Sequence, residues 1–139
     1  MNNLDRFIKM QEIYYDDALK EIKRGYKSSH WIWYIFPQLK GLGHSSTSEY
    51  YGIDGEEEAI EYINNEYLKN NLIEISNELY KHNKNITDIL GYPDDLKVKS
   101  CMTLFEQVDD NEIYNKILSK FYNNQRDNKT LELLKSRGK

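Results

Sequence analysis

The chain has 139 residues, of which 39% are hydrophobic and 30% are charged. This balance fits one globular domain and excludes a wholly disordered chain. Lys and Arg number 19 and Asp and Glu number 23, which gives a formal charge of −4. No overall positive charge therefore draws the protein to nucleic acid or to an anionic membrane. The single cysteine excludes an intramolecular disulfide and a zinc site built from several cysteines.

The sequence carries no signal for a membrane or for export. The longest apolar run, Trp31 to Pro37, has seven residues, whereas a membrane span needs about 18. Residues 1–6 lack the basic region and the apolar block of a signal peptide. With a free cysteine and no export signal, we expect a cytoplasmic protein.

The N-terminal segment predicts an amphipathic helix. Its apolar stripe follows i, i+3, i+4 spacing and consists of Leu4, Phe7, Ile8, Gln11, Tyr15, Ala18, Leu19 and Ile22. Asn3 is the expected N-cap. Lys23 and Arg24 suit the negative end of the helix dipole, and Gly25 can adopt the left-handed conformation that closes a helix.

The segment after this helix has a different pattern. Residues 31–36 are apolar on every side, so periodicity does not decide between a short helix and a strand. Pro37 ends the run, residues 41–43 form a turn, and residues 44–48 are polar. We therefore expect an irregular, aromatic-rich connection after the first helix.

The rest of the chain has helical spacing throughout. One helix is expected from Asp54 to about Tyr80, with Asp54 and Glu57 as its capping box. The further expected helices lie at 87–90, from Pro93 to Val108, at 112–121 behind an Asp109–Glu112 capping box, and from Asp127 to near Gly138. No segment alternates with the period of a strand. The fold prediction is one all-α domain over residues 1–139, with about six helices.

Three motifs carry residues that can do chemistry. His30 lies between a serine pair and the indoles of Trp31 and Trp33, so it can act as a general base while the indoles stack on a ligand ring. The alternative is structural, with the tryptophans as core anchors and His30 bonded to a backbone carbonyl. The motif alone favours this structural role.

The second motif is the glycine turn. Gly41 and Gly43 let the backbone approach a phosphate, and Ser45 can donate a hydrogen bond to it. The motif lacks the lysine of a phosphate-binding loop and the third glycine of a dinucleotide fingerprint. An ordinary turn is therefore the favoured interpretation.

The third motif places Asp94 beside Asp95 after Pro93. Mutual repulsion can raise the pKa of one carboxyl and create an acid/base pair. Adjacent helical residues point in different directions, however, so capping of a helix start is favoured. Cys101, on an apolar stripe, is expected to be a buried inert thiol. Three histidines without helical spacing predict no metal site.

The sequence of residues 29–43 closely resembles the hallmark motif of a bacterial family, domain-of-unknown-function family 1810. It reads Ser-His-Trp-Ile-Trp-Tyr-Ile-Phe-Pro-Gln-Leu-Lys-Gly-Leu-Gly. Two further blocks are similar to the same family. They are residues 91–105, from Gly91-Tyr92-Pro93-Asp94-Asp95 to Phe105, and residues 120–131, with Arg126-Asp127. Asn128 stands where a proline is common, and residues 80–85 look like a loop of this protein alone. The label calpastatin, which members sometimes carry, has no support in these residues.

This resemblance implies an all-α, multihelical single domain and no established activity. It also suggests that the three blocks meet around one pocket. A fainter likeness links residues 118–134 to the closing stretch of the NADAR or YbiA-like family, and that likeness implies N-glycosidic or ADP-ribose chemistry.

Two functional hypotheses follow. In the first, the chain binds a nucleotide-like small molecule and, as an enzyme, hydrolyses an N-glycosidic bond, with His30, Asp94 and Asp95 as catalytic residues. The expected ligand-binding residues are Ser29, Trp31, Trp33, Gly41, Gly43, Ser45, Lys97 and Arg126. No cofactor is predicted. In the second, the chain is a non-enzymatic protein-interaction module, for which its many tyrosines are suited.

Overall fold

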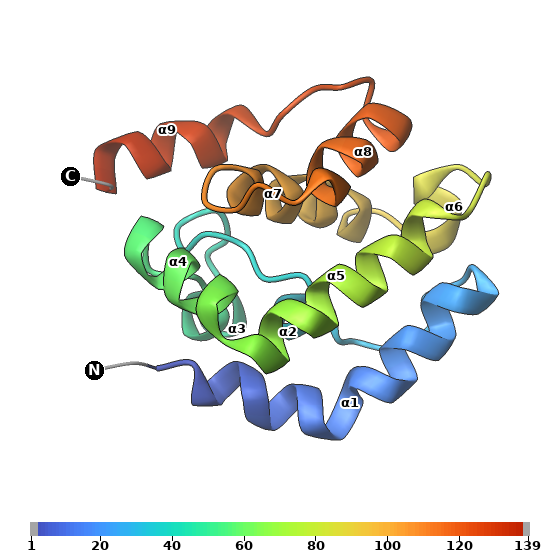
Figure 1. The fold of residues 1–139 in the computed structure, drawn as a ribbon, viewed down its shortest axis with the longest axis horizontal. Coiled ribbons are helices and arrows are strands. Elements are labelled where there is room, and N and C mark those ends of the chain that lie inside the picture. The colour runs from blue at the N-terminus through green and yellow to red at the C-terminus, as the bar shows by residue number, and fades with distance from the viewer. Residues whose placement is uncertain (1–2, 138–139) are drawn as a thin grey trace.

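Amphipathic helices around one shared apolar core make up the fold (Figure 1). The computed structural model describes residues 3–137, and these contain nine helices and no strand. In chain order the helices are α1 (Asp5–Arg24), α2 (Ile32–Ile35), α3 (Ser46–Tyr51), α4 (Glu56–Asn64), α5 (Glu66–Tyr80), α6 (Ile86–Leu90), α7 (Asp94–Glu106), α8 (Glu112–Phe121) and α9 (Asn128–Arg137). Six of them have nine residues or more, so the prediction of an all-α domain with about six helices is confirmed.

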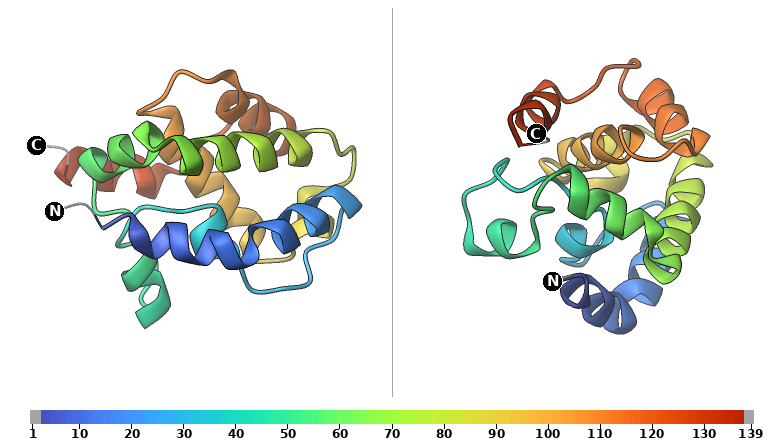
Figure 2. Two further views of the ribbon diagram at one scale, coloured as in Figure 1. Left: turned by 60° about the horizontal axis from the view of Figure 1, so that its bottom comes forward. Right: turned by 60° about the vertical axis from the view of Figure 1, so that its left-hand side comes forward.

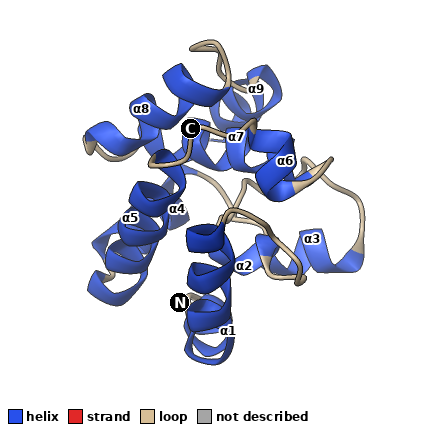
Figure 3. Ribbon diagram, turned by 90° about the vertical axis from the view of Figure 1, so that its right-hand side faces the viewer, coloured by secondary structure: helices blue, strands red, loops and turns tan. Residues whose placement is uncertain are grey.

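The long helices pack in a chain of neighbours. α1 packs on α5, α5 packs on α8, and α8 packs on α7, while α9 lies against α7. Figure 3 shows α6 and α7 between α8 and α9 on one side and α1 to α3 on the other. None of the helices in the described part of the chain is long and apolar enough to cross a membrane.

The first helix ends as expected and begins differently. Gly25 closes α1 at φ 87°, the left-handed conformation that favours glycine. Leu4, and not Asn3, occupies the N-cap position, and it makes no side-chain capping bond. The carbonyl oxygen of Asn3 instead accepts a hydrogen bond from Arg6 Nη1 at 2.5 Å. The expected Asn3 cap is therefore wrong.

The helix expected from Asp54 to Tyr80 is two helices. The break is at Asn65, which adopts an extended conformation and whose side chain accepts a hydrogen bond from the Leu68 amide at 3.0 Å. The expected Asp54–Glu57 capping box is also wrong. The Asp54 amide donates to Glu58 Oε1 at 2.9 Å, and Gly55 is the N-cap residue of α4.

Of the two remaining expected caps, one is wrong and one is confirmed. Asn111, and not Asp109, caps α8 by accepting from the Ile113 amide, while Asp109 accepts from the Tyr114 hydroxyl. Asp127 caps α9 through the Thr130 amide at 3.0 Å, as expected. The expected helix end near Gly138 lies outside the described residues.

The aromatic connection contains two short helices. Residues 32–35 form α2, so the run that periodicity left open is helical. Residues 31–36 are buried except for Trp33, which is half-buried. α3 was not expected; it forms because Ser45 accepts a hydrogen bond from the Ser48 amide at 3.1 Å. Figure 2 shows α3 at the outer edge of the fold in both views.

Candidate functional site

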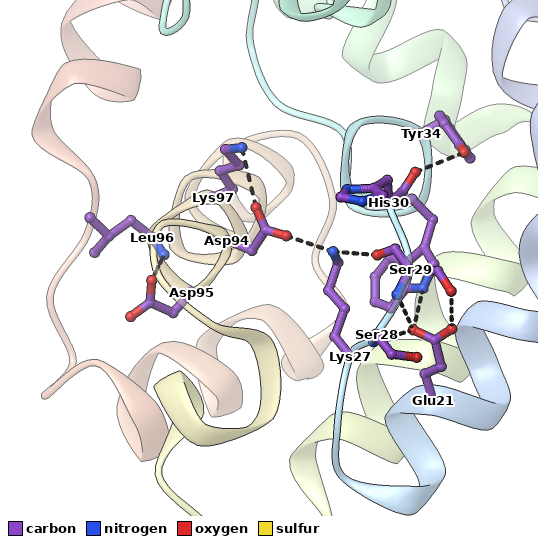
Figure 4. A network of polar contacts seen from close by, with 11 residues as sticks. Glu21, Lys27, Ser28, Ser29, His30, Tyr34, Asp94, Asp95, Leu96 and Lys97 are labelled. Atoms are coloured by element: carbon purple, nitrogen blue, oxygen red, sulfur yellow. Dashed lines mark hydrogen bonds and ion pairs between the residues drawn. The ribbon is translucent and has the colours of Figure 1, made fainter.

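Glu21 on α1 organises the segment that carries the first motif (Figure 4). Its Oε1 accepts hydrogen bonds from the Ser28 amide at 2.7 Å, the Ser29 amide at 3.0 Å and Trp31 Nε1 at 2.9 Å. Its Oε2 accepts from the Ser29 hydroxyl at 2.6 Å. Burial alone raises the pKa of Glu21, but these hydrogen bonds outweigh it and lower the pKa to about 2. Glu21 is therefore a carboxylate at neutral pH.

Asp94, at the start of α7, joins the third motif to the first. Its Oδ2 lies 2.7 Å from Lys27 Nζ, and its Oδ1 lies 3.2 Å from Lys97 Nζ. Lys27 Nζ also donates to the carbonyl oxygen of Ser29 at 2.6 Å. These bonds fix the segment before α2 against the start of α7, as Figure 4 shows.

Both lysines also cover a tryptophan. Lys27 Nζ lies 4.9 Å from the ring centre of Trp31, and Lys97 Nζ lies 4.2 Å from that of Trp33. Trp31 is 1% exposed and so forms part of the core. Trp31 therefore fits the structural alternative for this motif, and a ligand ring has no free access to the two indole faces that the ammonium groups cover.

The glycine turn lies against Trp33. A Cβ atom on Gly43 would be 3.7 Å from the Trp33 ring and 2.8 Å from Ser48 Oγ, so only glycine fits this approach without a shift of its neighbours. Gly41 has φ 105°, which also favours glycine. Ser45 is engaged as the cap of α3. The contacts of this turn are thus those of packing and capping.

Asp95 points away from Asp94 (Figure 4). Its Oδ2 accepts from the Thr87 hydroxyl at 2.6 Å, and its Oδ1 accepts from the Leu96 amide at 2.9 Å. The two carboxyl groups therefore do not share one site, which agrees with the capping interpretation rather than with an acid/base pair.

Arg126 does not join the group around Asp94. Its Nε and Nη2 donate to the two carboxylate oxygens of Glu106 at 2.9 and 2.5 Å. This pairing lowers the pKa of Glu106. Asp94 and Glu106 are the first and last residues of the 13-residue helix α7, which separates them by about 18 Å along the axis. The first two blocks meet at Asp94. The third block lies along α7: the Tyr122 hydroxyl donates to the Asp95 carbonyl oxygen at 2.5 Å near the start of the helix, whereas Arg126 lies at its other end.

His30 borders a pocket of about 260 Å³. The residues around it are Tyr14, Asp17, Ser29, His30, Trp31 and Tyr34. The ring centres of Tyr14 and Tyr34 lie 5.8 Å apart, and the two ring planes are inclined at 42° to each other. Burial, with the neighbouring phenols of Tyr14 and Tyr51, raises the pKa of Tyr34 to about 12, so its hydroxyl stays neutral. That hydroxyl donates to the carbonyl oxygen of His30 at 3.1 Å. No hydrogen bond engages the His30 imidazole within residues 3–137, so it is available to a ligand.

Sequence reasoning missed four residues of this region. Lys27 and Glu21 hold the first motif in place, and Tyr14 and Asp17 on α1 complete the pocket. Only Glu21 had a usable signal: it follows Ala18 by three positions and so lies on the apolar stripe, where a buried carboxylate needs polar partners. Tyr14 and Asp17 have no such signal, because exposed polar positions on a helix are ordinary.

The remaining observations limit the chemistry. Among the described residues, no group of three or more His, Cys, Asp or Glu side chains is placed to hold a metal ion. Cys101 is fully buried, and burial raises its pKa well above the ordinary value, as expected for an inert thiol. A larger hollow of about 560 Å³, bordered by Glu56 of α4, Gln107 directly after α7 and residues of α9, contains none of the sequence-predicted residues.

Comparison with known proteins gives a family but no activity. The crystal structure of the conserved hypothetical protein Rv1873 from Mycobacterium tuberculosis is similar to this chain, with a TM-score of 0.94 and 38% sequence identity over 96% of this chain and 97% of that one. No curated protein matches the chain. Residues 1–134 match the family described as protein of unknown function, DUF1810. With nearly the whole sequence matched, the chain belongs to the DUF1810 family.

Proposed function

We propose that this protein binds a small molecule with a planar ring, of nucleobase or nucleoside size, in the pocket beside His30. One observation carries the proposal: aromatic rings, an imidazole and a carboxylate border the same hollow. Ligand sites typically combine an apolar, aromatic wall with a few polar groups that fix orientation. The first motif of the sequence supplies three of the residues around it, Ser29, His30 and Trp31.

The size of the pocket supports a small ligand. Its volume of about 260 Å³ is just below the range of about 300–1,000 Å³ that drug-sized ligands occupy. A base with its ribose suits this volume better than a complete ADP-ribose. The phosphates of a nucleotide would extend beyond the pocket, past Ser29 toward Lys27, whose ammonium group lies 2.6 Å from the Ser29 carbonyl oxygen.

Each bordering group has a role in this proposal. The Tyr14 and Tyr34 rings stack on the ligand ring, and Asp17 and His30 form hydrogen bonds to its nitrogen atoms or to ribose hydroxyls. Asp94, Lys97 and the Gly41–Ser45 turn do not touch the ligand in this arrangement. They position the segment that carries His30.

The catalytic form of the proposal is N-glycoside hydrolysis. That reaction passes through an oxocarbenium-like transition state, which a nearby carboxylate stabilises. Asp17 is the carboxylate that borders the pocket, whereas Asp94 is paired with two lysines. In this form His30 carries the proton, and Asp17 takes the role that the sequence analysis gave to Asp94 and Asp95.

Calorimetric titration and thermal denaturation with adenosine, AMP, NAD and ADP-ribose test the binding proposal. A ligand that binds the folded state raises the melting temperature. Tyr14→Ala should weaken binding about tenfold, the effect of losing one stacked ring. Tyr67→Ala is the matched control, because Tyr14 is 39% exposed and Tyr67 is 40% exposed on another helix. Equal loss in both variants, or no stabilisation by any of the four ligands, contradicts the proposal.

A protein-interaction module is the second candidate, and α3 is the observation in its favour. Tyr50 on α3 is 59% exposed, and the centre of its ring lies 4.8 Å from that of Tyr51. The two rings form an aromatic surface at the edge of the fold. Light scattering of the wild type and of Tyr50→Ser tests for self-association through this surface. A monomer that binds adenosine favours the first candidate, and association that depends on Tyr50 favours the second.

A further inference from the structure

We propose that a second pocket, at the junction of α7 and the end of α8, binds a small molecule that carries a phosphate group. This pocket has a volume of about 380 Å³ and shares no bordering residue with the pocket beside His30. Its walls come from Leu96 and Lys99 on α7, Lys120 and Phe121 on α8, and Asn123 and Gln125 in the turn that follows.

The charge of the pocket is opposite to that of the chain. Two lysines border it and no Asp or Glu does, although the chain carries a formal charge of −4. Lys120 is held in place, because its Nζ donates to the Tyr80 carbonyl oxygen at 2.5 Å and lies 4.8 Å from the centre of the Tyr80 ring. A fixed ammonium group of this kind is a ready partner for an anion.

Lys99 adds a charge that no residue within 3–137 compensates by an ion pair. Its ammonium group has no ion pair or hydrogen bond within residues 3–137. Asp95, one turn earlier on α7, does not neutralise it, because the Asp95 carboxylate is bonded to the Thr87 hydroxyl and the Leu96 amide. The pocket therefore contains one fixed and one free cation.

The turn after α8 is held in a conformation that side chains disfavour. Asn123 and Asn124 have φ 56° and φ 61°, a left-handed conformation that asparagine adopts more readily than most residues. The Asn124 amide donates to the Leu118 carbonyl oxygen at 2.9 Å, and Arg126 Nη1 donates to the Asn124 carbonyl oxygen at 2.8 Å. These bonds give the turn a defined conformation, and the turn carries Asn123 and Gln125 at the border of the pocket.

In the same turn, two side chains are bonded to the rest of the fold and two border the pocket. Asn124 and Arg126 are tied into the fold, since Asn124 Oδ1 accepts from Ser119 and Arg126 pairs with Glu106. Asn123 and Gln125 alternate with them and border the pocket, where their amides can bond to hydroxyl groups of a ligand. Leu96 and Phe121 supply apolar contact. This combination of side chains suits the phosphate monoester of a small molecule that carries hydroxyl groups.

A titration followed by two-dimensional NMR tests this site, with inorganic phosphate and glucose 6-phosphate as probes. We expect saturable shifts at residues 96–99 and 120–125, at ligand concentrations below about 20 mM. Lys99→Gln should weaken binding about tenfold through loss of one charge-assisted hydrogen bond. Lys129→Gln, at an exposed position of α9, removes the same charge and should leave the affinity within about twofold, because solvent screens distant charges.

Three results would overturn the site. They are equal weakening in both variants, shifts that lie outside the pocket, and no saturation at about 20 mM of either probe. Lys99 makes no polar side-chain contact in the described fold, so Lys99→Gln should remain folded. The urea midpoint of the variant, measured without ligand, checks this. If that variant is unfolded, Gln125→Ala, in the turn, provides the same comparison.

Discussion

Replacing Glu21 by glutamine tests the hydrogen-bonded centre that holds the first motif. Glutamine has the same shape, so it keeps the packing but removes the charge. Its single acceptor oxygen can still receive the three N–H bonds that now reach Oε1, and its amide faces the Ser29 hydroxyl. The change therefore isolates the part of the stabilisation that depends on a carboxylate.

The pKa of Glu21 gives the expected magnitude. A value of about 2 in the folded protein, against the ordinary 4.5, corresponds to a stabilisation of about 3 kcal/mol at neutral pH. Because the folded pKa is lowered, this contribution is present above about pH 4.5 and is lost as the pH falls toward 2. We expect Glu21→Gln to lower the free energy of unfolding by about 2–3 kcal/mol at pH 7.

Urea denaturation followed by tryptophan fluorescence measures this difference at pH 7 and at pH 3. The difference between wild type and Glu21→Gln should fall by more than half at pH 3, since most of the wild-type advantage has titrated away. Other carboxylates with lowered pKa values, such as Glu58 and Glu106, titrate in both proteins and cancel. Glu12→Gln, exposed on the same helix, should change stability by no more than about 0.5 kcal/mol. Equal midpoints at pH 7, or a difference that is the same at both pH values, would refute the reasoning.

Two further predictions concern packing. Gly52→Ala should cost about 2 kcal/mol, because its Cβ would lie 2.7 Å from Lys40 Cα and 2.9 Å from the Ser48 carbonyl oxygen; an unchanged urea midpoint would contradict this steric account. Cys101 should react with a thiol reagent far more slowly in the native protein than in urea, because its thiol is buried and its pKa is raised; fast native labelling would show that the core opens at α7.

The helices were predictable where local chemistry determines them. The end of α1 follows from Gly25 and the start of α9 follows from Asp127, since both signals act within one turn. The break between α4 and α5 was not predictable from periodicity, because apolar spacing continues on both sides of Asn65. There a single side chain, bonded to the Leu68 amide, competes with continuation of the helix.

The candidate site was predictable only in part, because its residues are combined by tertiary distance. The resemblance suggested that three blocks meet, and two of them do through the Lys27–Asp94 pair. The third block contacts the second, because the Tyr122 hydroxyl donates to the Asp95 carbonyl oxygen. Its Arg126 does not reach Asp94, because it pairs with Glu106, which lies about 18 Å from Asp94 along α7. A helix between two motifs acts as a fixed spacer, and its length decides whether they share a pocket.

Glu21 shows how one missed residue can control a whole site. Its partners lie seven to ten positions later in the chain, and they reach it only because the left-handed turn at Gly25 reverses the chain. The turn places two backbone amides, a hydroxyl and an indole N–H around one carboxylate. Since burial of an unpaired carboxylate is costly, Glu21 and the segment that surrounds it depend on each other for folding. The position of His30 therefore rests on an acid in the preceding helix, and Glu21→Gln should weaken ligand binding as well as stability.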